Sequence, residues 1–99
     1  VTVYGGFLPK TSGKAQRILE ASRIMMESLG TGRLVLYVSP HRLLKDLELI
    51  KTVMGNVTCV LCRELTKMHE ERVEAKVEEL IEKYKAGVKG ELVLIIGLE

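Results

Sequence analysis

Short apolar segments typical of β-strands alternate along this chain with segments of helical periodicity. Residues 34–38 (LVLYV), 57–61 (VTCVL) and 91–96 (ELVLII) are three such apolar runs, and residues 1–4 (VTVY) form a fourth. The run at 34–38 does not alternate with polar residues, which predicts burial on both faces, as in a central parallel strand. Strands separated by helices predict an α/β fold, with helices packed on the faces of a sheet.

Residues 12–29 are predicted to form the first helix. Their apolar side chains fall near the i, i+3, i+4, i+7 spacing of one helical face. Thr11 or Ser12 can cap the start of this helix, and Gly30 suits the position just past its end.

The segment YVSPHR, residues 37–42, predicts a turn from a strand into a second helix. The Ser39 side chain can accept from backbone N–H groups of the next turn, and Pro40 suits the first helical position. An apolar stripe begins at Leu43, and Gly55 ends the helix.

Residues 68–84 allow two interpretations. Alternation favours a strand at 71–76 followed by a helix at 77–85, whereas the high Glu and Lys content favours one continuous helix from Met68. With the strand accepted, residues 1–99 are expected to form a single small domain with a mixed, mostly parallel five-stranded sheet and helices packed on its faces.

Composition limits the possible functions. Hydrophobic residues make up 46% of the 99 residues and aromatic ones only 4%, so the core is expected to be aliphatic. A net charge of +2 is too small to attract nucleic acid at long range, so any RNA contact must be local. Without a long apolar segment or a leader, the cytoplasm is the expected compartment. Val1 already lies in an apparent strand, which suggests a fragment of a longer protein.

Two short motifs have a structural and a functional interpretation. Cys59 and Cys62 have CxxC spacing, but on a strand an odd offset puts their thiols on opposite faces, which favours buried cysteines over a redox or zinc pair, and no metal site is predicted. The segment 5–14 (GGFLPKTSGK) lacks the spacing of a phosphate-binding P-loop. The following helix start can still hold a phosphate, although ordinary capping is the simpler role.

Charged residues follow two of the predicted strands. His41 and Arg42 come just after the strand at 34–38, and residues 63–67 (RELTK) follow the strand at 57–61. If these strands are parallel, both loops lie on the sheet edge where ligands of open α/β sheets gather. The alternative is an ordinary solvated loop with a weak ion pair. No familiar catalytic set is present, so the catalytic residues stay unassigned.

Several motifs together resemble a known family. GFLP at 6–9, SGK at 12–14, YxSPHRLL at 37–44, RELTKxxEE at 63–71 and KGExV at 89–93 are similar, in order and approximate spacing, to the C-terminal domain of the ribosomal RNA small subunit methyltransferase I family. That family belongs to the tetrapyrrole methylases, so the resemblance implies their C-terminal domain fold.

The resemblance implies a two-domain enzyme. Such an enzyme transfers the methyl group of S-adenosylmethionine to the ribose 2′-hydroxyl of a cytidine in small-subunit (16S) ribosomal RNA, usually as a homodimer. The cofactor lies between two domains, of which residues 1–99 would be the C-terminal one. The N-terminal cofactor-binding domain is absent from this chain, so the fragment alone is expected to be inactive.

The resemblance also assigns residues. Those expected at the cofactor are Val38, Ser39, Pro40, Arg63, Glu64, Thr66 and Ile96. Those expected at the RNA are His41, Arg42, Lys67, Lys10 and Lys14. The chain departs from the family pattern at Val38, where a Glu is usual, and at residues 74–76, where an RGT-like stretch is usual.

Two other functions fit the same residues. A methylase of this fold can act on another acceptor, such as a small tetrapyrrole. Alternatively, the chain is a non-catalytic binding or dimerisation module.

Overall fold

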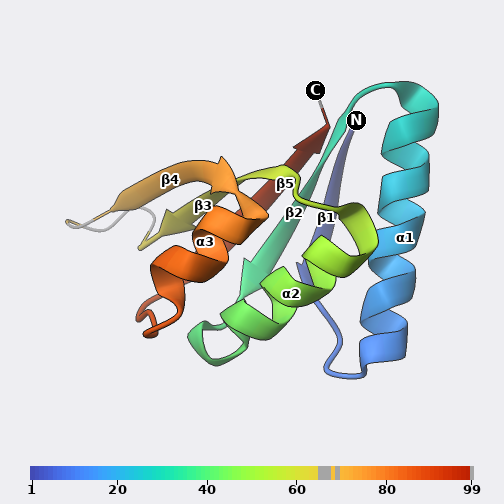
Figure 1. The fold of residues 1–99 in the computed structure, drawn as a ribbon. Helices are drawn as coiled ribbons and strands as arrows, with labels where there is room; N and C mark the ends of the chain where they lie inside the picture. The colour runs from blue at the N-terminus through green and yellow to red at the C-terminus, as the bar shows by residue number, and fades with distance from the viewer. Residues whose placement is uncertain (65–67, 69, 99) are drawn as a thin grey trace.

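A computed structural model of the chain describes residues 1–64, 68 and 70–98. Five strands and three α-helices follow one another in the order expected from the sequence (Figure 1). The elements are β1 (Thr2–Phe7), α1 (Ser12–Leu29), β2 (Gly32–Val38), the 3₁₀ helix η1 (Pro40–Arg42), α2 (Leu43–Met54), β3 (Thr58–Arg63), β4 (Glu71–Lys76), α3 (Val77–Tyr84) and β5 (Leu92–Leu98).

Local predictions agree closely with these bounds. The first helix begins and ends where its periodicity predicts, and Gly30 follows it in the left-handed conformation with φ 75°. The strand at 71–76 is confirmed, so the alternative of a continuous helix from Met68 is wrong. The side-chain caps are not formed, however, because neither Thr11 nor Ser39 makes a side-chain capping hydrogen bond. Pro40 does occupy the start of η1, as predicted.

The sheet has the strand order β1-β2-β5-β3-β4. The β1–β2 pair is parallel, whereas β2–β5, β5–β3 and β3–β4 are antiparallel. The expectation of a mostly parallel sheet is therefore wrong. The reason is the last strand, β5, which lies between β2 and β3 and is antiparallel to both. Those two strands still point the same way, as predicted, but β5 separates them.

The three helices lie on one face of the sheet (Figure 1). Along β2, Leu34, Leu36 and Val38 are buried beneath them, whereas Val35 is half-buried and Tyr37 is 54% exposed. Burial of β2 on both faces was therefore a wrong prediction for this domain. The opposite face, which we call the open face, carries apolar side chains without a helix layer.

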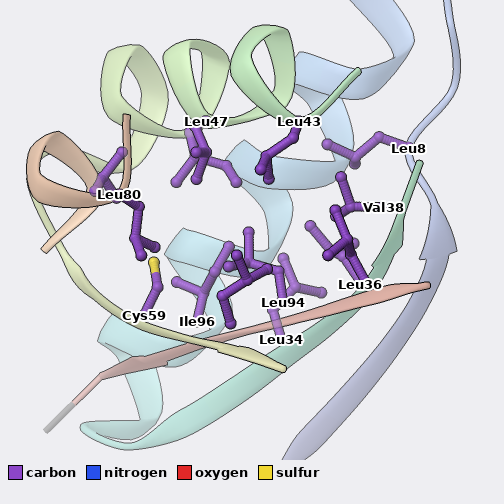
Figure 2. Close-up of a cluster of buried hydrophobic side chains, with 14 of the residues drawn as sticks. Leu8, Leu34, Leu36, Val38, Leu43, Leu47, Cys59, Leu80, Leu94 and Ile96 are labelled. Carbon is purple, nitrogen blue, oxygen red and sulfur yellow. The ribbon is translucent and has the colours of Figure 1, made fainter. Parts of the chain in front are cut away.

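The core fills the space between the sheet and the helices and is largely aliphatic, as the composition predicts. Leu43 and Leu47 of α2 and Leu80 of α3 face the sheet, and Leu34, Leu94 and Ile96 rise from β2 and β5 to meet them (Figure 2). Burying one such side chain stabilises the fold by roughly 2 kcal/mol. This packing holds the strand ends at fixed positions relative to the helices.

Candidate functional site at the ends of β2 and β3

The ends of β2 and β3 meet at one edge of the sheet. Val38 and Arg63, the last residues of these strands, both pair with Leu92 at the start of β5, one on each side. Two interstrand spacings separate them, roughly 10 Å. The sequence-based expectation that both strand ends share one edge is thus confirmed.

The turn after β2 directs neighbouring residues into different places. The Arg42 N–H donates to the Ser39 carbonyl oxygen at 3.0 Å, which closes the single turn of η1. His41 lines a hollow between η1 and the loop that joins α3 to β5, whereas Arg42 lines a groove between α1 and α2. YVSPHR is therefore both a strand-to-helix turn and a divider between two concave surfaces.

We call the first of these surfaces the rim hollow. Its volume is about 600 Å³, within the range of small-molecule sites. Its walls come from η1 and the start of α2 on one side and from the end of α3 and the following loop on the other. The lining residues are Pro40, His41, Leu43, Leu44, Tyr84, Lys85, Ala86, Gly87, Val88, Lys89 and Gly90.

Arg63 and Glu64 fix the loop that forms one wall of the rim hollow. Arg63 Nη1 donates to the Lys89 carbonyl oxygen at 3.3 Å. The Glu64 N–H donates to the Glu91 carbonyl oxygen at 2.9 Å, and the Glu91 N–H donates back to Glu64 Oε1 at 2.8 Å. Glu64 has φ 57°, a left-handed conformation that a non-glycine residue rarely adopts. Arg63 and Glu64 therefore hold the loop in place without lining the rim hollow themselves.

A hydrogen bond between Tyr84 and Glu71 stabilises the structure next to these contacts. The Tyr84 hydroxyl donates to Glu71 Oε1 at 2.9 Å, and Arg63 lies 3.5 Å from the other carboxylate oxygen. This hydrogen bond, followed by the Arg63 charge, lowers the pKa of Glu71. Burial, followed by the same hydrogen bond, raises the pKa of Tyr84 to about 12. The phenol is therefore neutral at physiological pH and acts as a donor that holds α3 to β4.

The second surface, which we call the α1–α2 groove, has a volume of about 540 Å³. It lies where the first turn of α1 faces α2. Its lining combines basic, acidic and apolar side chains. The residues are Lys10, Ser12, Ala15, Arg42, Leu44, Lys45, Asp46, Glu48, Leu49 and Thr52.

Not all residues predicted for the cofactor come together. Pro40 lines the rim hollow, Ser39 comes just before η1, and Val38 is buried with 3% exposure. Ile96 pairs with Leu34 and Cys59, about 13 Å along the sheet from Val38, and its side chain lies in the core. Because β5 runs against β2, its end lies at the opposite edge. Thr66 lies outside the described residues.

The residues predicted for RNA divide between the two surfaces. Lys10 and Arg42 line the α1–α2 groove, and His41 lines the rim hollow. Lys14 is exposed on the first turn of α1 and lines neither surface. Lys67 lies outside the described residues.

Several lining residues were missed by the sequence analysis. The loop at 85–90 lines the rim hollow, and its KGE segment was noted as a motif without a site being assigned to it. Lys45 and Asp46 line the α1–α2 groove. The signal for Asp46 was its place four residues after Arg42, since side chains at this spacing meet on one helical face.

The cysteines lie on opposite faces of β3, as predicted. Cys59 pairs with Ile96 on the helix side, and Cys62 pairs with Val93 on the open face. Both are free and buried, and burial raises the pKa of Cys59 to about 12. Within the described ranges, no group of three or more His, Cys, Asp or Glu side chains is arranged to hold a metal ion.

In the described part of the chain, no helix has the length and apolar character needed to span a bilayer. No protein-family model matches the sequence. Curated proteins named ribosomal RNA small subunit methyltransferase I do match it. The protein from Hydrogenobaculum sp. (strain Y04AAS1) is 45% identical over 74 residues, which cover 73% of this chain and 32% of the relative.

Two further relatives with the same name match nearly the whole chain. The protein from Rickettsia prowazekii (strain Madrid E) is 35% identical over 95% of this chain and 32% of its own length. The protein from Coprothermobacter proteolyticus is 40% identical over 92% of this chain and 38% of its own length. The chain thus spans about a third of the length of these relatives. It belongs to the ribosomal RNA small subunit methyltransferase I family and corresponds to the C-terminal domain of that family.

Proposed function

We propose that this domain forms one wall of the active-site cleft of a methyltransferase that acts on small-subunit ribosomal RNA. The reaction is methylation of a cytidine ribose 2′-hydroxyl in 16S RNA, with S-adenosylmethionine as the methyl donor. The observation that supports this proposal is the rim hollow, which lies at strand ends whose motifs resemble those of the family.

The residues of the rim hollow suit the adenosine part of this cofactor. Pro40, Leu44 and Val88 offer apolar surface to a flat base, and the peptide groups of residues 87–90 can hydrogen-bond to its polar edge. S-adenosylmethionine supplies an activated methyl group. The protein's contribution is to hold the acceptor hydroxyl in line with it, and positioning of this kind can account for much of a rate enhancement.

We further propose that an N-terminal domain of the same enzyme completes the cleft, that the enzyme is a homodimer, and that it acts in the cytoplasm, where its RNA substrate lies. The fold is proposed to be that of the C-terminal domain of the tetrapyrrole methylases. Size-exclusion chromatography with light scattering on the full-length protein tests the dimer, and a mass equal to one chain would contradict it.

Blocking the rim hollow tests the cofactor assignment. Ala86 lines the hollow and is exposed, so Ala86→Trp fills it without entering the core. Ala21 is exposed on α1 outside the hollow, so Ala21→Trp is the matched control. In the full-length enzyme, the first substitution is expected to weaken S-adenosylmethionine binding at least about tenfold, or 1.4 kcal/mol. Equal affinity in both variants, measured by calorimetry, would refute the assignment.

The acceptor needs a separate assay. Full-length enzyme is incubated with labelled S-adenosylmethionine and either small-subunit ribosomal RNA or a porphyrinogen. Label in the RNA that maps by mass spectrometry to a cytidine ribose supports the proposal. Label only in the porphyrinogen favours a tetrapyrrole methylase, and the absence of both transfer and cofactor binding favours a non-catalytic module.

A further inference from the structure

Asp46 is a buried carboxylate at the α1–α2 groove. Its side chain is 7% exposed and lines the groove from the first turn of α2. Among the described residues, its recorded ion-pair partner is Arg42, whose Nε lies 3.9 Å from Asp46 Oδ1. That separation is too long for a hydrogen bond. A carboxylate buried without a donor loses its hydration and gains little in return.

Arg42 is in a similar situation. Its Nε is buried and has no hydrogen-bond partner among the described residues. Buried polar atoms of native proteins nearly always have a partner, so the unpartnered Arg42 Nε and the largely buried Asp46 carboxylate beside it need an explanation. Burial raises the pKa of Asp46, although the nearby Arg42 charge lowers it. The fold therefore does not by itself stabilise the charged form of this carboxylate.

The surroundings of Asp46 match the parts of a nucleotide. Lys10 and Lys45 are exposed cations on the two sides of the groove, suited to a phosphate. Ala15, Leu44 and Leu49 give an apolar wall for a base. The first turn of α1 contributes Ser12 and Ala15 to the lining, holds no acidic side chain and has no side-chain cap, so its first N–H groups are available as donors near the groove.

We propose that the α1–α2 groove binds one nucleotide of the RNA substrate and that Asp46 accepts a hydrogen bond from the exocyclic amino group of its base. Carboxylates recognise such amino groups, and cytosine N4 is one example. Uracil has a carbonyl oxygen at the corresponding position and would leave Asp46 without a donor. The inference rests on the proposed function, because it takes RNA to be the substrate, and it adds a base-reading residue outside the rim hollow.

The test compares binding of short cytidine and uridine oligonucleotides to the full-length enzyme. The wild type is expected to bind the cytidine oligomer about tenfold more tightly, as one good base contact allows. Asp46→Leu, which keeps the branched shape of the side chain and removes the acceptor, is expected to abolish this preference. Asp46→Asn, which keeps a carbonyl acceptor, is expected to retain part of it. Glu27→Gln is the matched control, because Glu27 is an exposed acidic residue of α1 that does not line the groove.

A structural role for Asp46 predicts a different result. In that case Asp46→Asn lowers the melting temperature, and both oligomers lose affinity together. We expect the melting temperature to stay the same or rise, because the substitution removes a poorly solvated charge. Equal binding of the two oligomers by the wild type, or loss of the preference in Glu27→Gln, overturns the inference. If the enzyme still methylates ribosomal RNA when one of these outcomes is found, the proposed function holds and only the role of Asp46 is refuted.

Discussion

Val38 and Arg63 lie across from the same residue, Leu92, although β2 and β3 are not neighbours in the sheet. Their relative position is set by backbone pairing with β5 and not by contact between their side chains. Substitutions on this edge should therefore change ligand contacts without moving the strand ends. The loop at 85–90 depends on side chains of Arg63 and Glu64, so it is the more sensitive part of the site.

Gly90→Ala is expected to disturb the rim hollow. Gly90 has φ 100°, and an added Cβ would overlap the Glu64 carboxylate that caps the Glu91 N–H. Gly87→Ala is a matched control, because Gly87 has a similar φ of 111° but open space around it. Both substitutions strain the backbone by roughly 1 kcal/mol or more. Only Gly90→Ala should also weaken S-adenosylmethionine binding to the full-length enzyme severalfold, measured by calorimetry.

An equal loss of affinity in the two glycine variants would contradict this reasoning. It would mean that backbone strain in the loop, and not the contact with Glu64, decides the shape of the hollow.

Tyr84→Phe is expected to destabilise the domain by about 1 kcal/mol. The substitution removes the hydrogen bond to Glu71, and the effect is modest because this carboxylate is 39% exposed to solvent. The pKa of Glu71 should rise toward its ordinary value, since its largest lowering cause is lost. Urea denaturation measures the stability, and NMR titration measures the pKa. Tyr4→Phe, at an 80% exposed site, should change neither quantity.

Stability should fall at alkaline pH through Cys59. Burial raises its pKa from 9.0 to about 12, so the unfolded thiol ionises near pH 9 while the folded one keeps its proton. Because the pKa of Cys59 is higher in the folded state, its contribution to the free energy of unfolding is fully present below pH 9, where the unfolded thiol begins to ionise. This contribution is lost as the pH rises from 9 to 12. The loss is about 4 kcal/mol over this window. Cys59→Ala should start from a lower stability at pH 8 but decline less steeply, as followed by urea denaturation at each pH.

Sequence patterns predicted features that depend on neighbouring residues. The helix at 12–29 and the strand at 71–76 follow from side-chain periodicity, and both have the expected bounds. The position of β5 depends on pairing between residues some sixty positions apart, such as Leu34 and Ile96, and no local pattern reports it. The apolar run in β2 predicts burial on both faces, but Tyr37 on the open face is 54% exposed. Apolar composition does not distinguish a strand covered by helices from one with an open face.

The same distinction applies to the candidate site. His41, Arg42 and Arg63 were predicted because strand ends in α/β sheets present loops at one edge, and they do lie at or just after strand ends on that edge. Ile96 was nominated through a resemblance, and the direction of β5 takes it to the other edge. Asp46 resembles an ordinary acidic residue in the first turn of a helix. Its burial against α1 appears only once the two helices are packed together.

Lys10 and Lys45 should account for part of the salt dependence of RNA binding. The chain has a net charge of only +2, so affinity must come from local clusters of cations, and these two lysines line the α1–α2 groove together. Each phosphate contact on a single strand contributes a slope of about 0.7 to log affinity against log salt. Lys10→Gln with Lys45→Gln in the full-length enzyme should therefore flatten the slope by about 1.4, measured by fluorescence anisotropy with a cytidine oligomer. Arg33→Gln is the control, because Arg33 is exposed on the open face at the opposite end of β2. A larger change in the Arg33 variant would place the RNA on the open face instead of in the groove.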